Sequence, residues 1–94
     1  MNTPIRFVKE IWQDERQPGD VQWFQIDDYN GRAGLHFICP KCTHLGGVHF
    51  NPPHDAGWTW DGNEAAPTVR PSILHDSKSC GWHGYLTAGE FVPC

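Results

Sequence analysis

The sequence has few aliphatic side chains, no long apolar run and no cluster of cations. No stretch approaches the roughly 20 apolar residues that a membrane-crossing helix needs, and Met1–Pro4 lacks the apolar segment that begins a secretory signal. Seven Lys and Arg stand singly among eleven Asp and Glu, which gives a formal charge of −4. Binding to nucleic acid phosphates needs clustered cations. We therefore expect a cytoplasmic protein, with nucleic acid a poor candidate partner and no membrane partner.

The apolar content rests instead on five Trp, five Phe and two Tyr. A chain of 94 residues buries a smaller share of its surface than a larger protein does, so its core needs a metal, a disulfide or a partner as reinforcement. Ten Gly and eight Pro without a repeat favour short strands joined by turns over long helices. The sequence predicts one all-β or β-rich domain over residues 1–94, with N-terminal strands or an arm over 1–34 and a metal-site region over 35–94.

Alternating apolar and polar residues, separated by turn residues, predict the individual strands. Residues 21–26 and 35–39 read as a hairpin joined by the turn-rich segment 27–34, and residues 46–50 as a further strand. Residues 67–74 contain two prolines four positions apart, which forbids a helix and predicts an extended segment at the edge of a sheet.

Two short motifs contain candidate metal ligands. Cys39-Pro-Lys-Cys42 has the spacing at which a tight turn directs both sulfurs to one tetrahedral metal, and Cys80-Gly-Trp-His83 repeats that spacing with an imidazole. With no secretory signal, such pairs are typical of metal sites rather than disulfides. The motifs predict one structural Zn²⁺ held by Cys39, Cys42, Cys80 and His83 in a zinc-ribbon-like domain.

Other ligand sets stay open at this stage. Cys94 is an alternative to His83, and His44 or His49 is an alternative local ligand beyond the first pair. Cys39 and Cys42 are alternatively reduced core thiols or a redox pair, although redox pairs usually begin a helix in a βαβ setting that is absent here.

The sequence offers little evidence for catalysis. A second, open metal site would need three protein ligands, a water and a base, and its candidate residues are His49, His54, His75, Asp55, Glu64 and Asp76. No His-Glu-x-x-His spacing supports it. Ser72 lacks the Gly-x-Ser-x-Gly context of a nucleophile elbow, so we interpret it as structural.

Four motifs together resemble a family of small phage and prophage proteins of unknown function, some of them labelled ammonia monooxygenase. The motifs are Cys39-Pro-Lys-Cys42, Trp58-Thr-Trp-Asp-Gly-Asn63, Pro67-Thr-x-x-Pro-Ser-Ile73 and Cys80-Gly-Trp-His-Gly-Tyr-Leu86. The resemblance covers about residues 37–91. It implies a phage or prophage origin, hence host cytoplasm, a metal site at Cys39, Cys42, Cys80 and His83, and no established activity. Thiolates favour closed zinc coordination over oxygenase chemistry.

The function we expect from the sequence is that of a small phage-type zinc-binding accessory protein that acts by binding a protein of unknown identity, without catalysis. A zinc-dependent hydrolase is the first alternative. A nucleic-acid-binding zinc module is the second, and it would require Arg6, Arg32, Lys41 and Arg70 to converge on one face.

Overall fold

The computed structural model describes residues 2–12, 15–75 and 80–94, which form two β-sheets and contain no helix. One sheet has the strand order β1 (Thr3–Pro4), β9 (Glu90–Pro93), β8 (Trp82–Thr87), β7 (Val69–His75) and β6 (Thr59–Trp60). The other has the order β2 (Arg6–Phe7), β3 (Asp20–Phe24), β4 (Gly34–Ile38) and β5 (Leu45–His49). The all-β prediction is confirmed. No described segment is a helix long and apolar enough to cross a membrane.

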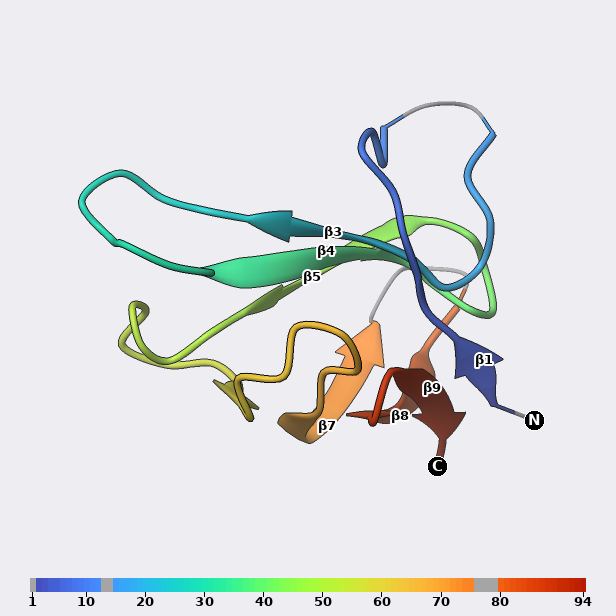
Figure 1. Cartoon of the computed structure of the whole chain (residues 1–94). Helices are drawn as coiled ribbons and strands as arrows, with labels where there is room; N and C mark the ends of the chain where they lie inside the picture. Colours follow the sequence, from blue (N-terminus) through green and yellow to red (C-terminus); the bar gives the residue numbers. More distant parts are fainter. Residues whose placement is uncertain (1, 13–14, 76–79) are drawn as a thin grey trace.

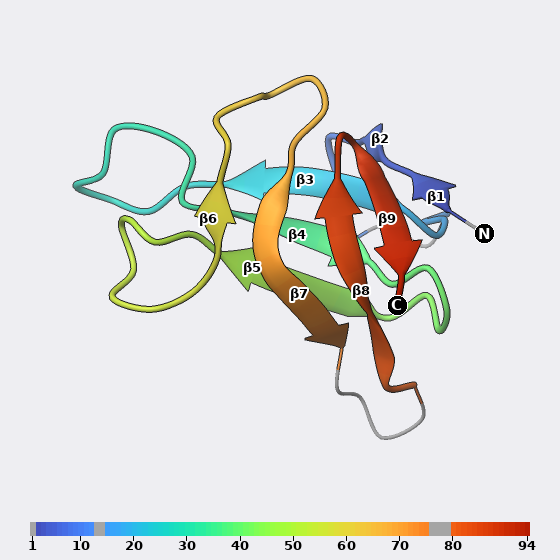
Figure 2. The ribbon, with the colours of Figure 1, turned by 90° about the horizontal axis from the view of Figure 1, so that it is seen from below.

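The two sheets form two layers with the core between them. Figure 1 shows β3, β4 and β5 in one layer and β7, β8 and β9 in the other, and Figure 2 shows the strands of one layer crossing over those of the other. Both layers contribute to the core, whose buried members include Leu35, Phe37 and Val48 from the four-stranded sheet and Leu86 and Phe91 from the five-stranded sheet. The core thus combines buried Ile, Leu and Val side chains with a smaller number of large aromatic rings.

Strand β8 illustrates how the sequence pattern sets the layers. Trp82, Gly84 and Leu86 are buried, whereas the intervening His83 and Tyr85 are exposed. Side chains alternate between the two faces of a strand, so β8 directs its apolar residues to the core and its polar residues to the outer face of the five-stranded sheet.

The structure places strands in each segment that the alternation predicted, with one difference in position. The segment over residues 67–74 forms β7, which is an inner strand because it pairs with β6 on one side and β8 on the other. The edge prediction for this segment was therefore wrong. Pro71 is tolerated because the pairing with β8 shifts register between Val69 and Ile73, so its missing N–H removes no regular ladder bond.

The N-terminal residues belong to both sheets. Strand β1 pairs antiparallel with β9, and β2 pairs parallel with β3. Asp20, almost fully buried at the start of β3, accepts two hydrogen bonds of 2.8 Å from the Arg6 guanidinium and one of 2.9 Å from the Gln17 backbone N–H. Burial alone would raise the pKa of Asp20, but Arg6 and the Gln17 N–H outweigh it and hold that pKa below the ordinary value.

Asp20→Asn is expected to destabilise the fold by about 1–3 kcal/mol, because it removes a charge-assisted pair of hydrogen bonds that links β2 to β3. Since the folded pKa of Asp20 is depressed, its contribution is present above the ordinary value of 3.8 and is lost as the pH falls through the folded pKa. Urea denaturation from neutral pH to pH 3 should show the two proteins converging in stability at the acid end. A constant difference down to the lowest pH would contradict this account.

Candidate functional site

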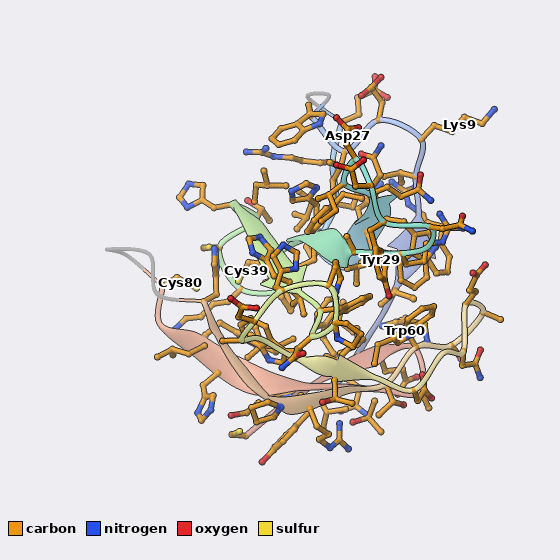
Figure 3. All side chains as sticks on the ribbon, turned by 90° about the vertical axis from the view of Figure 1, so that its left-hand side faces the viewer. Lys9, Asp27, Tyr29, Cys39, Trp60 and Cys80 are labelled. Atoms are coloured by element: carbon orange, nitrogen blue, oxygen red, sulfur yellow. The ribbon has the colours of Figure 1, made fainter. Side chains whose placement is uncertain are left out.

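Three cysteines and one histidine converge at one end of the two layers. The donor atoms of Cys39, Cys42, His75 and Cys80 all lie within 4.8 Å of one another. Cys39 follows β4, Cys42 ends the next turn, His75 is the last residue of β7, and Cys80 precedes β8. Figure 3 shows Cys39 and Cys80, from different layers, side by side, in keeping with the 3.5 Å between their sulfurs. The cluster therefore joins the two sheets.

The turn after β4 shapes the first half of this cluster. The Cys39 backbone N–H donates to the His44 carbonyl at 2.9 Å, and the Thr43 N–H donates to the Cys39 carbonyl at 3.1 Å. Thr43 takes a left-handed backbone conformation with φ 61°, which closes the turn. The Lys41 N–H donates to Cys39 Sγ at 3.4 Å, so the backbone itself stabilises negative charge on this sulfur.

The second half comes from one end of the β7–β8 hairpin, where β7 ends at His75 and Cys80 precedes β8. His75 Nδ1 lies 3.6 Å from Cys42 Sγ, while its Nε2 lies 3.3 Å from the Leu45 carbonyl oxygen. A hydrogen bond from Nε2 to a carbonyl fixes the tautomer in which Nδ1 is available as a ligand. The Trp82 N–H donates to Cys80 Sγ at 3.4 Å, which repeats the backbone–sulfur contact of the first half.

Two of the distances between these donor atoms match the edges of a tetrahedral metal site. Zn–S bonds of about 2.3 Å and Zn–N bonds of about 2.0 Å place tetrahedral donors roughly 3.5–3.8 Å apart. The sulfur–sulfur distance of 3.5 Å and the sulfur–nitrogen distance of 3.6 Å agree with those edges. Four protein donors fill a tetrahedral shell, which is the pattern of a structural site rather than one with an open position for water.

The environment of Cys39 disfavours redox chemistry. Burial raises the pKa of the Cys39 thiol to about 11, against smaller opposing effects of nearby backbone N–H groups. A reactive thiol needs a lowered pKa, since the thiolate is the nucleophile. The Cys39 thiol is therefore a poor nucleophile, and a metal ion that bound there would displace its proton.

The structure brings together Cys39, Cys42 and Cys80 of the predicted ligand set and places His83 elsewhere. Because the neighbouring Trp82 points into the core, strand alternation turns His83 to the opposite, exposed face. His75 supplies the imidazole instead. The other candidates, Cys94, His44 and His49, are exposed and are not members of the cluster.

His83 has a different neighbour on the outer face of the five-stranded sheet. Its Nε2 lies 2.8 Å from the Ser72 hydroxyl oxygen. This is a short hydrogen bond, and in the tautomer with its proton on Nδ1 the imidazole accepts from the serine hydroxyl. A serine whose hydroxyl donates to an imidazole is the nucleophile–base arrangement of acyl-transfer enzymes.

The register shift in β7 positions this pair. Val69 faces Leu86 and Ile73 faces Gly84, so the stretch 70–72 of β7 lies opposite the single residue Tyr85 of β8. A bulge of this kind redirects side chains and is frequent beside active sites. The backbone around both residues is held, because the Trp58 indole N–H donates to the Ser72 carbonyl at 3.2 Å and the Cys94 N–H to the His83 carbonyl at 3.0 Å.

The remaining histidines do not form a second metal cluster among the described residues. The rings of His49 and His54 stack at 4.8 Å, and Phe24 packs against both. Burial, with His49 nearby, lowers the pKa of His36 and favours its neutral form. Asp76, a candidate base for the open site, lies outside the described residues. The cations predicted for nucleic acid are partly engaged, since Arg6 and Arg32 pair with Asp20 and Glu64.

A family model described as "Bacterial ubiquitination-like system serine protease (BubE)" matches residues 8–94. The chain belongs to the BubE family. Comparison with curated proteins and with solved structures found no match. The BubE model covers every residue of both the metal cluster and the Ser72–His83 pair. The resemblance to phage and prophage proteins stays a prediction.

Sequence reasoning missed two features of this BubE-family chain. His75 was considered only as a ligand of a second, open metal site, although its position five residues before Cys80 would have allowed both to meet across a hairpin. Ser72 was interpreted as structural because a motif for α/β-hydrolases was the test applied. No short-range signal links it to His83, since their contact depends on the register shift between two strands.

Proposed function

We propose that this protein is a serine peptidase of a bacterial ubiquitination-like system, with Ser72 as the nucleophile and His83 as the general base. The observation that carries the proposal is the 2.8 Å contact between Ser72 Oγ and His83 Nε2 on an exposed sheet face. Membership of a family described as serine proteases supports the same chemistry. The partner is then a protein substrate, which binds beside the pair.

The proposed reaction is hydrolysis through an acyl-enzyme. Ser72 Oγ gives its proton to His83 Nε2 as it bonds to the carbonyl carbon of the scissile peptide bond. The C–N bond breaks, the departing amine takes the proton from Nε2, and an acyl ester remains on Ser72. Water then gives a proton to Nε2 as its oxygen attacks the ester, and that proton returns to Oγ when the acid is released. One water is consumed for each bond cut.

The metal cluster has a structural role in this proposal. Cys39, Cys42, His75 and Cys80 would hold one Zn²⁺, the ion that tetrahedral thiolate and imidazole donors favour. Bound there, the ion supplies folding free energy. This arrangement disfavours the zinc-hydrolase alternative, because all four positions are taken by protein atoms. A ligand set of thiols also suits the reducing cytoplasm that we expect for this protein.

A serine-reactive fluorophosphonate probe tests the proposal directly. The probe is expected to add covalently to Ser72, mapped by mass spectrometry of the digested protein, because His83 removes the hydroxyl proton as the phosphorus–oxygen bond forms and fluoride leaves. Ser72→Ala should abolish the labelling. His83→Ala should slow it by roughly 10²–10⁴-fold, the usual contribution of a general base.

The chain supplies its own control, since Ser77 and Ser79 are its other two serines. The double variant Ser77→Ala/Ser79→Ala should label like the wild type. Absence of labelling at Ser72 in a folded, metal-loaded protein would overturn the peptidase proposal. The remaining hypothesis would then be a zinc-binding accessory protein that acts by binding another protein. The closed metal cluster supports that hypothesis without the Ser72–His83 pair.

A further inference from the structure

The outer face of the five-stranded sheet is hollowed next to the Ser72–His83 pair. An open depression of about 700 Å³ is lined by Thr59, Arg70, Pro71, Tyr85, Thr87 and Val92. Pro71 adjoins Ser72 in β7, and Tyr85 lies two residues after His83 on the same face of β8. Two residues of strand span about 6–7 Å, so the depression begins within one or two substrate residues of the serine hydroxyl.

Among the residues that the structure describes, Arg70 is the one cation that lines this depression. Its guanidinium lies over the Tyr85 ring, with 4.9 Å between Cζ and the ring centroid. Its Nη1 donates to the Val69 carbonyl at 2.8 Å and to the Leu86 carbonyl at 3.3 Å. Stacking and these two bonds fix the plane of the guanidinium, which lowers the entropy lost when the group binds a ligand.

No acidic side chain pairs with Arg70 in the part of the chain that the structure describes, whereas Arg6 and Arg32 each have one. Within the described residues the Arg70 side chain donates its hydrogen bonds through Nη1 alone, so Nε and Nη2 can donate to a ligand. A guanidinium fork of this kind matches a carboxylate in a bidentate contact. The apolar surfaces of Pro71, Tyr85 and Val92 complete a floor on which an extended peptide can lie.

We propose that this depression is the substrate subsite of the peptidase and that Arg70 binds a carboxylate of the substrate within two or three residues of the scissile bond. The proposal rests on the proposed function of Ser72 and His83. Either an Asp or Glu side chain or the C-terminal carboxylate of the substrate supplies this chemistry. Arg70 is thus a specificity residue, outside the bond-breaking steps themselves.

The test uses a defined mixture of synthetic peptides, prepared once as free acids and once as C-terminal amides, incubated with the metal-loaded wild-type protein. Mass spectrometry maps the cut sites, and kcat/KM is then measured for cleaved peptides and their Glu→Gln and Asp→Asn counterparts. The carboxylate form should be cut about tenfold to a hundredfold faster, the range for a hydrogen bond to a charged group. Preference for Asp or Glu near the cut identifies the side-chain source, and loss of cleavage in the amides identifies the terminal source.

Variants of two arginines separate this inference from the proposed function. Arg70→Gln should bring the ratio of carboxylate to neutral rates close to one, and Arg70→Lys should keep part of it because the charge stays while the fork is lost. Arg32→Gln, which alters an arginine paired with Glu64, should leave the ratio unchanged. The ratio compares two substrates of the same variant, so a general loss of activity lowers both rates and leaves the ratio unchanged.

The inference would be overturned if the wild-type protein cut carboxylate and neutral peptides at nearly equal rates, or if its preference for the carboxylate persisted in Arg70→Gln. Cleavage that depends on Ser72 would in either case still support the proposed function. A wild-type protein that cuts no peptide in a Ser72-dependent way would overturn both.

Discussion

Cys80→Ser is expected to lose the bound metal and to unfold, whereas Cys94→Ser is expected to change neither property. Cys80 belongs to the cluster that joins the two sheets, and its sulfur lies 3.5 Å from that of Cys39. A structural zinc contributes on the order of 10 kcal/mol of apparent binding free energy in small domains. The whole net stability of a small domain is about 5–15 kcal/mol. Loss of a bound metal would therefore remove a contribution as large as that net stability.

Native mass spectrometry with metal analysis, followed by near-ultraviolet circular dichroism, measures both effects. The five tryptophans report tertiary packing, and one metal ion per wild-type chain is expected. Treatment with a strong chelator should reproduce the loss of signal seen in Cys80→Ser. Cys94, exposed and outside the cluster, is the matched control. Equal damage from both substitutions, or a wild-type fold that survives complete removal of metal, would contradict the structural role.

Local patterns predicted much of this fold because its strands are short and bounded by turn residues. The hairpin of β3 and β4 follows directly from alternation around the Gly-rich segment 27–34. The inner position of β7 did not follow, since the rule that keeps Pro out of inner strands assumes a regular ladder and Pro71 lies where the ladder is irregular. The parallel pairing of β2 with β3 had no signal in the sequence either.

The metal cluster and the Ser72–His83 pair also differ in how far the sequence alone predicts them. Cys39 and Cys42 are close in sequence, so their spacing alone predicts that they share a metal. His75 and Cys80 face each other only across a hairpin, and the choice between His75 and His83 depends on which face of the sheet each occupies. The contact of Ser72 with His83 depends on a register shift, which no spacing rule encodes. Side-chain contacts that depend on the exact register of two strands were therefore the part that the sequence could not supply.

One hairpin carries residues of both sites, and its strand periodicity explains how. Ser72 and His75 are three residues apart on β7, an odd separation, so they project from opposite faces. Ser72 faces outward to His83, while His75 faces inward to the cysteines. On the returning side Cys80 is in the cluster, and His83 follows three residues later. The candidate metal ligands thus lie at the end of the hairpin whose two strands position the serine and the imidazole.

His75→Ala and His83→Ala are therefore expected to fail in opposite ways. His83→Ala should keep the metal and the fold but lose roughly 10²–10⁴-fold in kcat/KM, because the general base is removed from an exposed sheet face. His75→Ala should lose the metal and with it tertiary structure, because three thiolates remain where four donors closed the shell. Peptide hydrolysis, metal content and near-ultraviolet circular dichroism on both variants separate the two outcomes.

The reverse pattern would return His83 to the metal site. If His83→Ala released the metal and His75→Ala kept it, the ligand set would be the one that the Cys-x-x-His spacing favours, and Ser72 would have no base. Addition of imidazole to His83→Ala gives a further distinction, since a small base that diffuses into an exposed site should restore part of the activity if His83 acts only as a proton acceptor. Rescue of hydrolysis without any change in metal content would assign the two histidines to separate tasks on one hairpin.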